Sequence, residues 1–208
     1  MNFIKTEAEV FAVQPSVKGC FTINVTGHRP DKLGKVYSAF DDKHKDILDA
    51  FKLFLWKTID AKRKQGVVAF KLVSGMALGI DSIFVRAAKD CKEYYKSKGV
   101  VITIVAALPC VKQYRKWLKP SRREYRQLLD MCDTGKLVNW YYSAKGMQLR
   151  NIYMVDQSDM VVTYWDGTDG GTANCLEYAD KKGKPLFNVF DIAKRMKEKR
   201  EAKLKASK

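Results

Sequence analysis

The sequence contains few of the residues from which metal sites and disulfide frameworks are built. It has two histidines, His28 and His44, and five scattered cysteines that form no CxxC pair. A zinc site normally needs such residues at close spacing, and an odd, dispersed set of cysteines is typical of a reducing compartment. We therefore expect no metal and no cofactor, and we interpret the cysteines as small buried hydrophobic residues.

Long apolar runs are also absent. No stretch approaches the roughly 20 residues needed to cross a bilayer, and residues 1–9 include acids but no apolar stretch of the signal-peptide type. We therefore expect a cytoplasmic protein with no membrane partner.

Acidic residues are outnumbered: 39 lysines and arginines stand against 23 acids, for a formal net charge of +16. Residues 191–208 hold eight basic residues and three acids, and residues 112–126 hold seven basic residues and one acid. In Lys112–Arg126 the cations alternate with Tyr114, Trp117 and Tyr125. This pattern suits either single-stranded nucleic acid or an exposed helix face whose aromatic rings pack inward, and both interpretations stay open.

The 208 residues, 46% of them hydrophobic, suffice for one large globular domain. Apolar periodicity predicts alternating strands and helices. Expected strands are 21–26, 67–73, 100–108, 137–141, 160–165 and 185–189, and expected helices are 43–64, 77–98, 121–132, 147–157 and 172–182. The pattern predicts an α/β, Rossmann-like, doubly wound and mostly parallel sheet with helices on both faces. The almost unbroken apolar run 100–108 is expected near its middle.

Residues 1–19 are predicted to be an N-terminal extension, and residues 20–190 the α/β domain. Residues 191–208 are predicted to be a basic tail, either a solvated helix or a disordered end.

Two segments, 73–81 and 158–172, each read as an apolar strand that ends in a small-residue turn and opens a helix. Such turns present free N–H groups and a positive helix end, which suits a phosphate at the carboxyl edge of a parallel sheet. In the first turn, Gly75 and Gly79 allow close approach of a ligand and Ser74 offers a hydroxyl. The alternative for this turn is tight packing of strand against helix.

Other candidates have similar alternatives. Asp81 either favours the helix dipole or binds a ribose hydroxyl, and Gly170-Gly171-Thr172 forms a phosphate cradle or a plain cap. Arg29 holds phosphate in bidentate fashion or forms a surface salt bridge, and Trp165 belongs to the core or stacks on a base. The remaining ligand-binding candidates are Gly27, His28, Arg150, Asn151, Asp166, Gly167 and Asn174.

Several ordered motifs carry a family resemblance: Thr26-Gly27-His28-Arg29-Pro30, then Ser74 to Asp81, then Arg150-Asn151, and finally Trp165-Asp166-Gly167 with Gly170-Gly171-Thr172. Together they resemble the SLOG superfamily, most closely its YpsA-like branch from bacteria and phages. The resemblance implies a Rossmann-like fold. The superfamily includes Lonely Guy phosphoribohydrolases, the single-stranded-DNA-binding DNA-processing protein A, and sensors of nucleotide messengers.

The comparison with Lonely Guy enzymes bears on catalysis. Met147 to Met154 resembles their arginine-containing motif, and Arg150 matches its arginine. Their acidic pair, however, is replaced by Asn174 and Cys175. Cleavage of an N-glycosidic bond generally needs a carboxylate. Substitute carboxylates are offered by Asp81, Asp166, Asp169 and Glu177.

The sequence therefore favours a protein that binds or senses a nucleotide or its derivative, such as an ADP-ribose-like or cyclic nucleotide. The alternative is a nucleotide-processing N-glycosidase, and a weaker one is a single-stranded DNA-binding protein. No catalytic residue is assigned, and a homo-oligomer stays open. The glycine turns and their basic neighbours are expected to meet in one pocket.

Overall fold

The structure, a computed structural model, describes residues 1–4, 6, 9 and 12–206; over these residues, six parallel strands form one sheet. The strands are β1 (Cys20–Gly27), β2 (Ala69–Ser74), β3 (Val101–Leu108), β4 (Thr134–Leu137), β5 (Met160–Tyr164) and β6 (Leu186–Asn188). Their order is β4-β3-β2-β1-β5-β6, and every neighbouring pair is parallel. Residues 5, 7–8, 10–11 and 207–208, which belong to the predicted extension and tail, lie outside the described residues.

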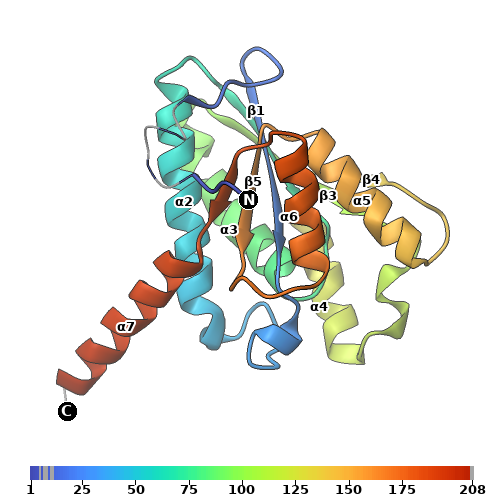
Figure 1. The fold of residues 1–208 in the computed structure, drawn as a ribbon. Coiled ribbons are helices and arrows are strands. Elements are labelled where there is room, and N and C mark those ends of the chain that lie inside the picture. Colours follow the sequence, from blue (N-terminus) through green and yellow to red (C-terminus); the bar gives the residue numbers. More distant parts are fainter. Residues whose placement is uncertain (5, 7–8, 10–11, 207–208) are drawn as a thin grey trace.

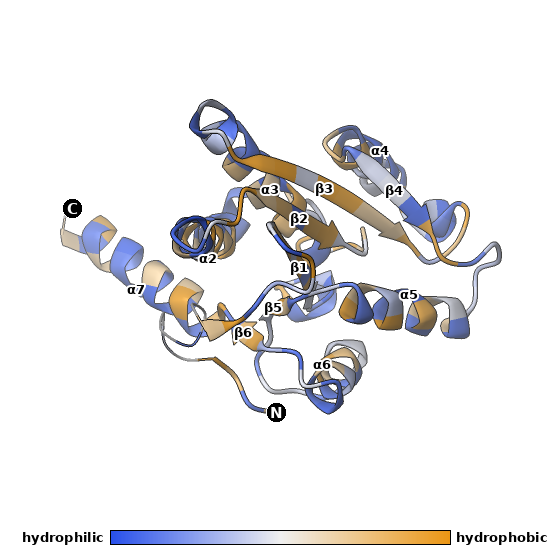
Figure 2. Ribbon diagram, turned by 90° about the horizontal axis from the view of Figure 1, so that it is seen from above, coloured by the Kyte–Doolittle hydropathy of each residue, from blue (hydrophilic) through white to orange (hydrophobic). Residues whose placement is uncertain are grey.

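Helices cover both faces of the sheet, as expected for a doubly wound Rossmann-like fold (Figures 1 and 2). The helices are α2 (Lys45–Arg63), α3 (Ile80–Tyr95), α4 (Lys119–Asp130), α5 (Ala144–Asp156), α6 (Gly171–Lys181) and α7 (Phe190–Ala206). Short 3-10 turns are η1 (Pro30–Lys32), η2 (Asp42–His44), η3 (Lys96–Lys98) and η4 (Gln113–Lys116). Figure 2 shows α2 and α3 on one side of the sheet and α5 and α6 on the other.

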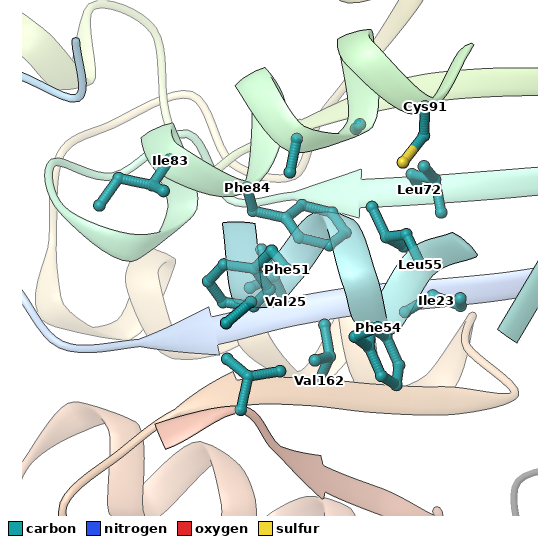
Figure 3. Close-up of a cluster of buried hydrophobic side chains, with 14 of the residues drawn as sticks. Ile23, Val25, Phe51, Phe54, Leu55, Leu72, Ile83, Phe84, Cys91 and Val162 are labelled. Atoms are coloured by element: carbon teal, nitrogen blue, oxygen red, sulfur yellow. The ribbon is translucent and has the colours of Figure 1, made fainter. Parts of the chain in front are cut away.

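The main core lies between the sheet and the α2–α3 layer. In β1, alternate residues Phe21, Ile23 and Val25 are fully buried and belong to this core, as the two-residue period of a strand requires. Figure 3 shows Phe51 of α2 and Phe84 of α3 meeting above β1, with ring centroids 5.6 Å apart in an edge-to-face arrangement. This core fixes the two helices against the centre of the sheet.

The structure corrects two predictions about strands. β3 is the second strand from one edge, so its expected position near the middle is wrong. The apolar run also overstates the burial of this strand: Ile102 and Ile104 are buried, whereas Val101 is exposed and the next two residues of its face are only half-buried. The predicted strand at 137–141 is also misplaced, because β4 occupies Thr134–Leu137 and the chain beyond it is a loop. β4 is largely exposed, so it lacks the apolar alternation by which strands are recognised.

The first residues of the chain pair with the sheet, and the C-terminal helix contacts the domain along only part of its length (Figure 1). The Ile4 amide donates to the Leu186 carbonyl in β6 at 2.7 Å. The tail forms α7, which is mostly exposed but buries Ala193 and pairs Arg200 with Asp46 of α2. No helix within the described ranges is long and apolar enough to span a membrane.

The strand order places a topological switch point between β1 and β5. From β1 to β4 the chain moves steadily toward one edge, and α5 then carries it back to β5, on the other side of β1. The loops that follow β1 and β5 therefore run to opposite faces and leave a crevice between them.

The Phe51–Phe84 contact gives a test of the core. Replacing Phe84 with alanine should lower the free energy of unfolding by about 3–5 kcal/mol, because it leaves a cavity in a fully buried site. Val101→Ala is the control: this side chain is 62% exposed, and its loss should change stability by less than about 0.5 kcal/mol. Chemical denaturation measures both. Equal effects of the two substitutions would contradict the described core.

Candidate functional site

A cavity of about 270 Å³ opens at the carboxyl edge of the sheet, at the β1–β5 switch point. It lies between the end of β1, the start of α3, one face of α5 and the start of α6. The residues that line it are Val25, Thr26, Gly27, His28, Arg29, Asp31, Lys32, Ala77, Asp81, Met147, Arg150, Asn151, Asp169, Gly170, Gly171 and Thr172.

The two glycine turns lie at the same edge of the sheet, as predicted, but they do not contribute equally to the cavity. Candidates that line it are Gly27, His28, Arg29, Asp81, Arg150, Asn151, Gly170, Gly171 and Thr172. Candidates that do not line it are Ser74, Gly75, Gly79, Asp166, Gly167 and Asn174.

The protein itself fills the first glycine turn. Arg150 of α5 places Nη1 3.2 Å from Oδ2 of Asp81, and both side chains are more than nine-tenths buried. The same carboxylate oxygen accepts the Ala77 amide at 3.2 Å. A Cβ on Gly75 would lie only 1.3 Å from Nη1 of Arg150. Gly75 therefore makes room for an internal ion pair.

Ser74 and Gly79 also have structural roles here. The Ser74 hydroxyl donates to the Asp81 carbonyl at 2.9 Å and accepts the Met76 amide at 3.1 Å. Gly79 has φ +93°, and a Cβ there would approach the His28 carbonyl oxygen to 2.5 Å. These contacts favour the alternative stated for the first glycine turn, in which its small residues allow the strand to pack tightly against the helix.

The second glycine turn is open. Gly170 precedes α6 with φ +137°, and no side chain caps the helix. A Cβ on Gly171 would meet no heavy atom within 4 Å. The first N–H groups of a helix have no partner within the helix, so this end of α6 presents unfilled donors and a positive dipole to the cavity.

A network of hydrogen bonds holds the loop that leads to α6. Asp166 Oδ1 lies 2.7 Å from Nε2 of His28 and accepts the Thr168 amide at 3.0 Å. Lys32 donates to the Asp169 carbonyl at 2.8 Å, and the Trp165 indole donates to the Thr168 carbonyl at 2.7 Å. Asp166 thus organises the turn from outside the cavity, and Trp165 is part of the packing.

The environment of Asp166 changes its acidity. Desolvation alone would raise the pKa of this carboxyl group, but hydrogen bonds from Thr168 and His28 outweigh it and lower the pKa to about 2. The carboxylate is therefore charged at any ordinary pH.

Charges of both signs line the cavity. Arg29 is partly open to solvent, and in the described part of the chain its guanidinium has no hydrogen bond or ion pair. Desolvation lowers the pKa of this group, Asp81 opposes that effect and Arg150 adds to it. With Asp31 and Asp169 also at the walls, the cavity offers acceptors as well as cations. Among the described residues, no cluster of three His, Cys, Asp or Glu is placed to hold a metal ion.

The basic stretch 112–126 lies beside the first glycine turn, because the Gln113 side chain donates to the Met76 carbonyl at 3.0 Å. Its aromatic rings face inward. Tyr125 is buried, and Tyr114 and Trp117 pack on it with centroids 5.2 and 5.3 Å away. The arrangement favours the second interpretation of this stretch, in which the aromatic rings pack inward and the cations lie on the surface.

The positions compared with the Lonely Guy acidic pair differ in exposure. Asn174 is exposed and outside the cavity, whereas Cys175 is buried, and burial raises its pKa to about 11. Glu177 is likewise exposed and does not line the cavity.

Sequence reasoning missed several lining residues. Asp31 and Lys32 follow Pro30 directly, in a turn of the kind that forms a site edge, so their position after β1 was an available signal. Met147 lies one helical turn before Arg150 and therefore on the same face of α5.

The chain is similar to several known proteins. The model of the YpsA family, described as "YspA SLOG family", matches residues 23–199. The uncharacterized SPbeta prophage-derived protein YoqJ of Bacillus subtilis (strain 168) is 32% identical over 125 residues, 54% of this chain and 70% of that protein.

Among solved structures, the chain is similar to DNA processing protein A from Helicobacter pylori, studied for its single-stranded DNA binding mode. The TM-score is 0.46 at 18% identity, over 81% of this chain and 64% of that one. The chain thus spans less than two thirds of that structure.

The crowding at Gly75 predicts a selective loss of stability. Gly75→Ala should displace Arg150 from Asp81 and destabilise the protein by about 3 kcal/mol or more, because a broken buried pair leaves an uncompensated charge. Gly171→Ala is the matched control and should unfold at nearly the wild-type temperature, since its Cβ has open space. Thermal unfolding compares them. Equal melting temperatures for the two variants would refute the assigned role of Gly75.

The acidity of Asp166 predicts a dependence on pH. A carboxyl pKa held at about 2, below the ordinary 3.8, stabilises the fold above pH 4, and this contribution is lost as the pH falls toward 2. Asp166→Asn should therefore cost roughly 1 kcal/mol at pH 7, allowing for solvent screening. The difference from wild type should shrink between pH 4 and pH 2. A difference that stays constant over this range would show that charge is not the cause.

Proposed function

Since the chain belongs to the YspA SLOG family, we propose that it binds and senses a nucleotide or nucleotide derivative, of the ADP-ribose-like or cyclic kind, in the cavity at the β1–β5 switch point. The ligand's phosphate lies at the N-terminus of α6. The prophage origin in the name of YoqJ favours a bacterial or phage source for this chain too.

The observation that carries this proposal is the pairing of an open helix end with a buried arginine. The N-terminus of α6 has no side-chain cap and has open space at Gly171. Arg150 lines the same cavity, is more than nine-tenths buried and has a side-chain Nε without a hydrogen-bond partner. Main-chain N–H groups, a helix dipole and a buried guanidinium together favour a phosphate.

The remaining polar groups suit the sugar and a further phosphate. Oδ2 of Asp81 contacts both Arg150 and the Ala77 amide, and within the described residues Oδ1 is left for a hydroxyl donor. Arg29, which lines the cavity, provides a cation that forms no hydrogen bond or ion pair with the other described residues. A ligand with both hydroxyl donors and phosphate oxygens matches this mixture better than a simple anion does.

The hydrolase alternative gains no support from the candidate carboxylates. Asp81 is committed to Arg150, and Asp166 and Glu177 do not line the cavity. Asp169 lines it, but its position alone does not favour catalysis. We therefore expect slow or absent release of free base, and a turnover in the usual enzyme range of about 1–10³ s⁻¹ would overturn the sensor proposal.

Gly171→Asp tests the phosphate position. Affinity for AMP or ADP-ribose, measured by titration calorimetry, should fall at least about a hundredfold, because the new carboxylate would face the phosphate. The fold should persist, since the site has room for the side chain and an acid is favourable in the first turn of a helix.

Gly171→Asn provides the matched control, since it has the same shape without the charge, and should bind far better than Gly171→Asp. A folded Gly171→Asp protein with wild-type affinity would remove the α6 turn from the site. Failure of the wild-type protein to bind AMP, cyclic AMP, ADP-ribose or ribose 5-phosphate would refute the proposed function itself.

A further inference from the structure

The loop between β4 and α5 carries three consecutive exposed aromatic residues. Trp140, Tyr141 and Tyr142 are 71%, 82% and 57% exposed. Burial of large apolar side chains drives folding, so a run of three aromatic rings in solvent on a domain with a well-formed core indicates a contact surface.

Hydrogen bonds and close packing fix the conformation of this loop. Asn139 donates from its side chain to the Tyr141 carbonyl at 2.9 Å, and the Ser143 hydroxyl caps α5 by accepting the Gly146 amide at 2.9 Å. A Cβ on Gly146 would lie 2.9 Å from Nδ2 of Asn139 and 3.3 Å from the Pro109 carbonyl oxygen. The loop thus packs closely on the first turn of α5, and the exposure of its rings is a defined feature of the fold.

Of the three rings, Tyr142 lies nearest to α5 along the chain. It precedes the cap of α5, the helix that contributes Met147 and Arg150 to the cavity wall. Desolvation lowers the pKa of the Arg29 guanidinium, and Tyr142 is among the groups that oppose this effect. On the side of η4, Nζ of Lys116 lies 5.3 Å from the centroid of the ring. Tyr142 therefore links the basic stretch to the helix that forms one wall of the cavity.

We propose that the Tyr142 ring is the platform on which the base of the bound nucleotide stacks, while the phosphate occupies the N-terminus of α6. The assignment rests on the proposed function and specifies the ligand class as one with an aromatic base. A cavity of about 270 Å³ is just below the usual range for ligand pockets, about 300–1,000 Å³. It accommodates a phosphorylated sugar, and the base then extends out of the cavity toward the loop that carries Tyr142.

The charges of the site favour a single nucleotide over a nucleic-acid strand. A strand needs a continuous basic groove along its backbone. Here Asp31, Asp81 and Asp169 line the cavity, and the three inward-packed rings of the basic stretch offer no further stacking faces. The exposed rings that precede α5 belong to three consecutive residues of one short loop, which suits one base better than a strand.

The test compares ligands with and without a base. Wild-type protein should bind AMP about tenfold or more tightly than ribose 5-phosphate, because stacking on an aromatic side chain contributes about 1–3 kcal/mol per base. Tyr142→Ala should remove this preference and leave the affinity for ribose 5-phosphate unchanged. Tyr142→Phe should retain it. Titration calorimetry gives each affinity, and circular dichroism checks that substitution of this exposed side chain leaves the fold intact.

Tyr141→Ala is the matched control, with the same residue type in the same loop; among the described residues, no basic group contacts its ring. It should bind AMP like wild type. Equal binding of AMP and ribose 5-phosphate, or unchanged AMP affinity in Tyr142→Ala, would overturn the stacking role. If Gly171→Asp still weakened both ligands, the proposed function would survive.

Two other outcomes would assign the loop to different occupants. A single-stranded oligothymidylate that binds more tightly than AMP, and is lost on Tyr142→Ala, would replace the nucleotide with a strand. A wild-type dimer in sedimentation that becomes monomeric in Tyr142→Ala would assign the ring to a second copy of the chain. Either result would contradict the proposal.

Discussion

The buried ion pair between Arg150 and Asp81 determines how the whole edge of the sheet is used. It joins α5 to the start of α3, and it occupies the space that the missing side chain of Gly75 leaves free. Such a pair is costly to form and more costly to break. Its position explains why two turns of similar sequence have different roles: one is closed by the protein's own charges, and the other remains open to a ligand.

The net charge of the protein and the charges inside the cavity affect ligand binding in different ways. The net charge of +16 draws anions toward the protein regardless of their identity. Inside the cavity, by contrast, Arg29, Lys32 and Arg150 stand with three aspartates. The balance between these groups, more than the overall charge, determines which anion fits, because each aspartate disfavours a ligand that brings only negative charge.

Much of the architecture could be predicted from the sequence, because strand and helix periods and glycine turns are local signals. The edge at which the candidate site lies could also be predicted, because the carboxyl ends of parallel strands meet at one edge of the sheet. The sequence could not reveal that Gly75 faces Arg150, which lies 75 residues away, or that Asp166 stabilises its turn through His28. These roles depend on contacts between distant segments. β4 is short and exposed, so it has no buried face from which a strand could be predicted. The sequence instead predicts a strand at 137–141, most of which is a loop.

The contrast between Gly75 and Gly171 changes how an alignment of relatives should be read. Glycine at the first position is tied to an arginine on α5, so the two are expected to be inherited together and to be replaced together. At the second position the surroundings are empty, and the groups offered there belong to the main chain. Alanine or serine could stand at that site in a homologue without loss of the donors. Alanine or serine at the position of Gly171 would therefore say little about lost binding, whereas any side chain at Gly75 would mark a different arrangement of Arg150 and Asp81.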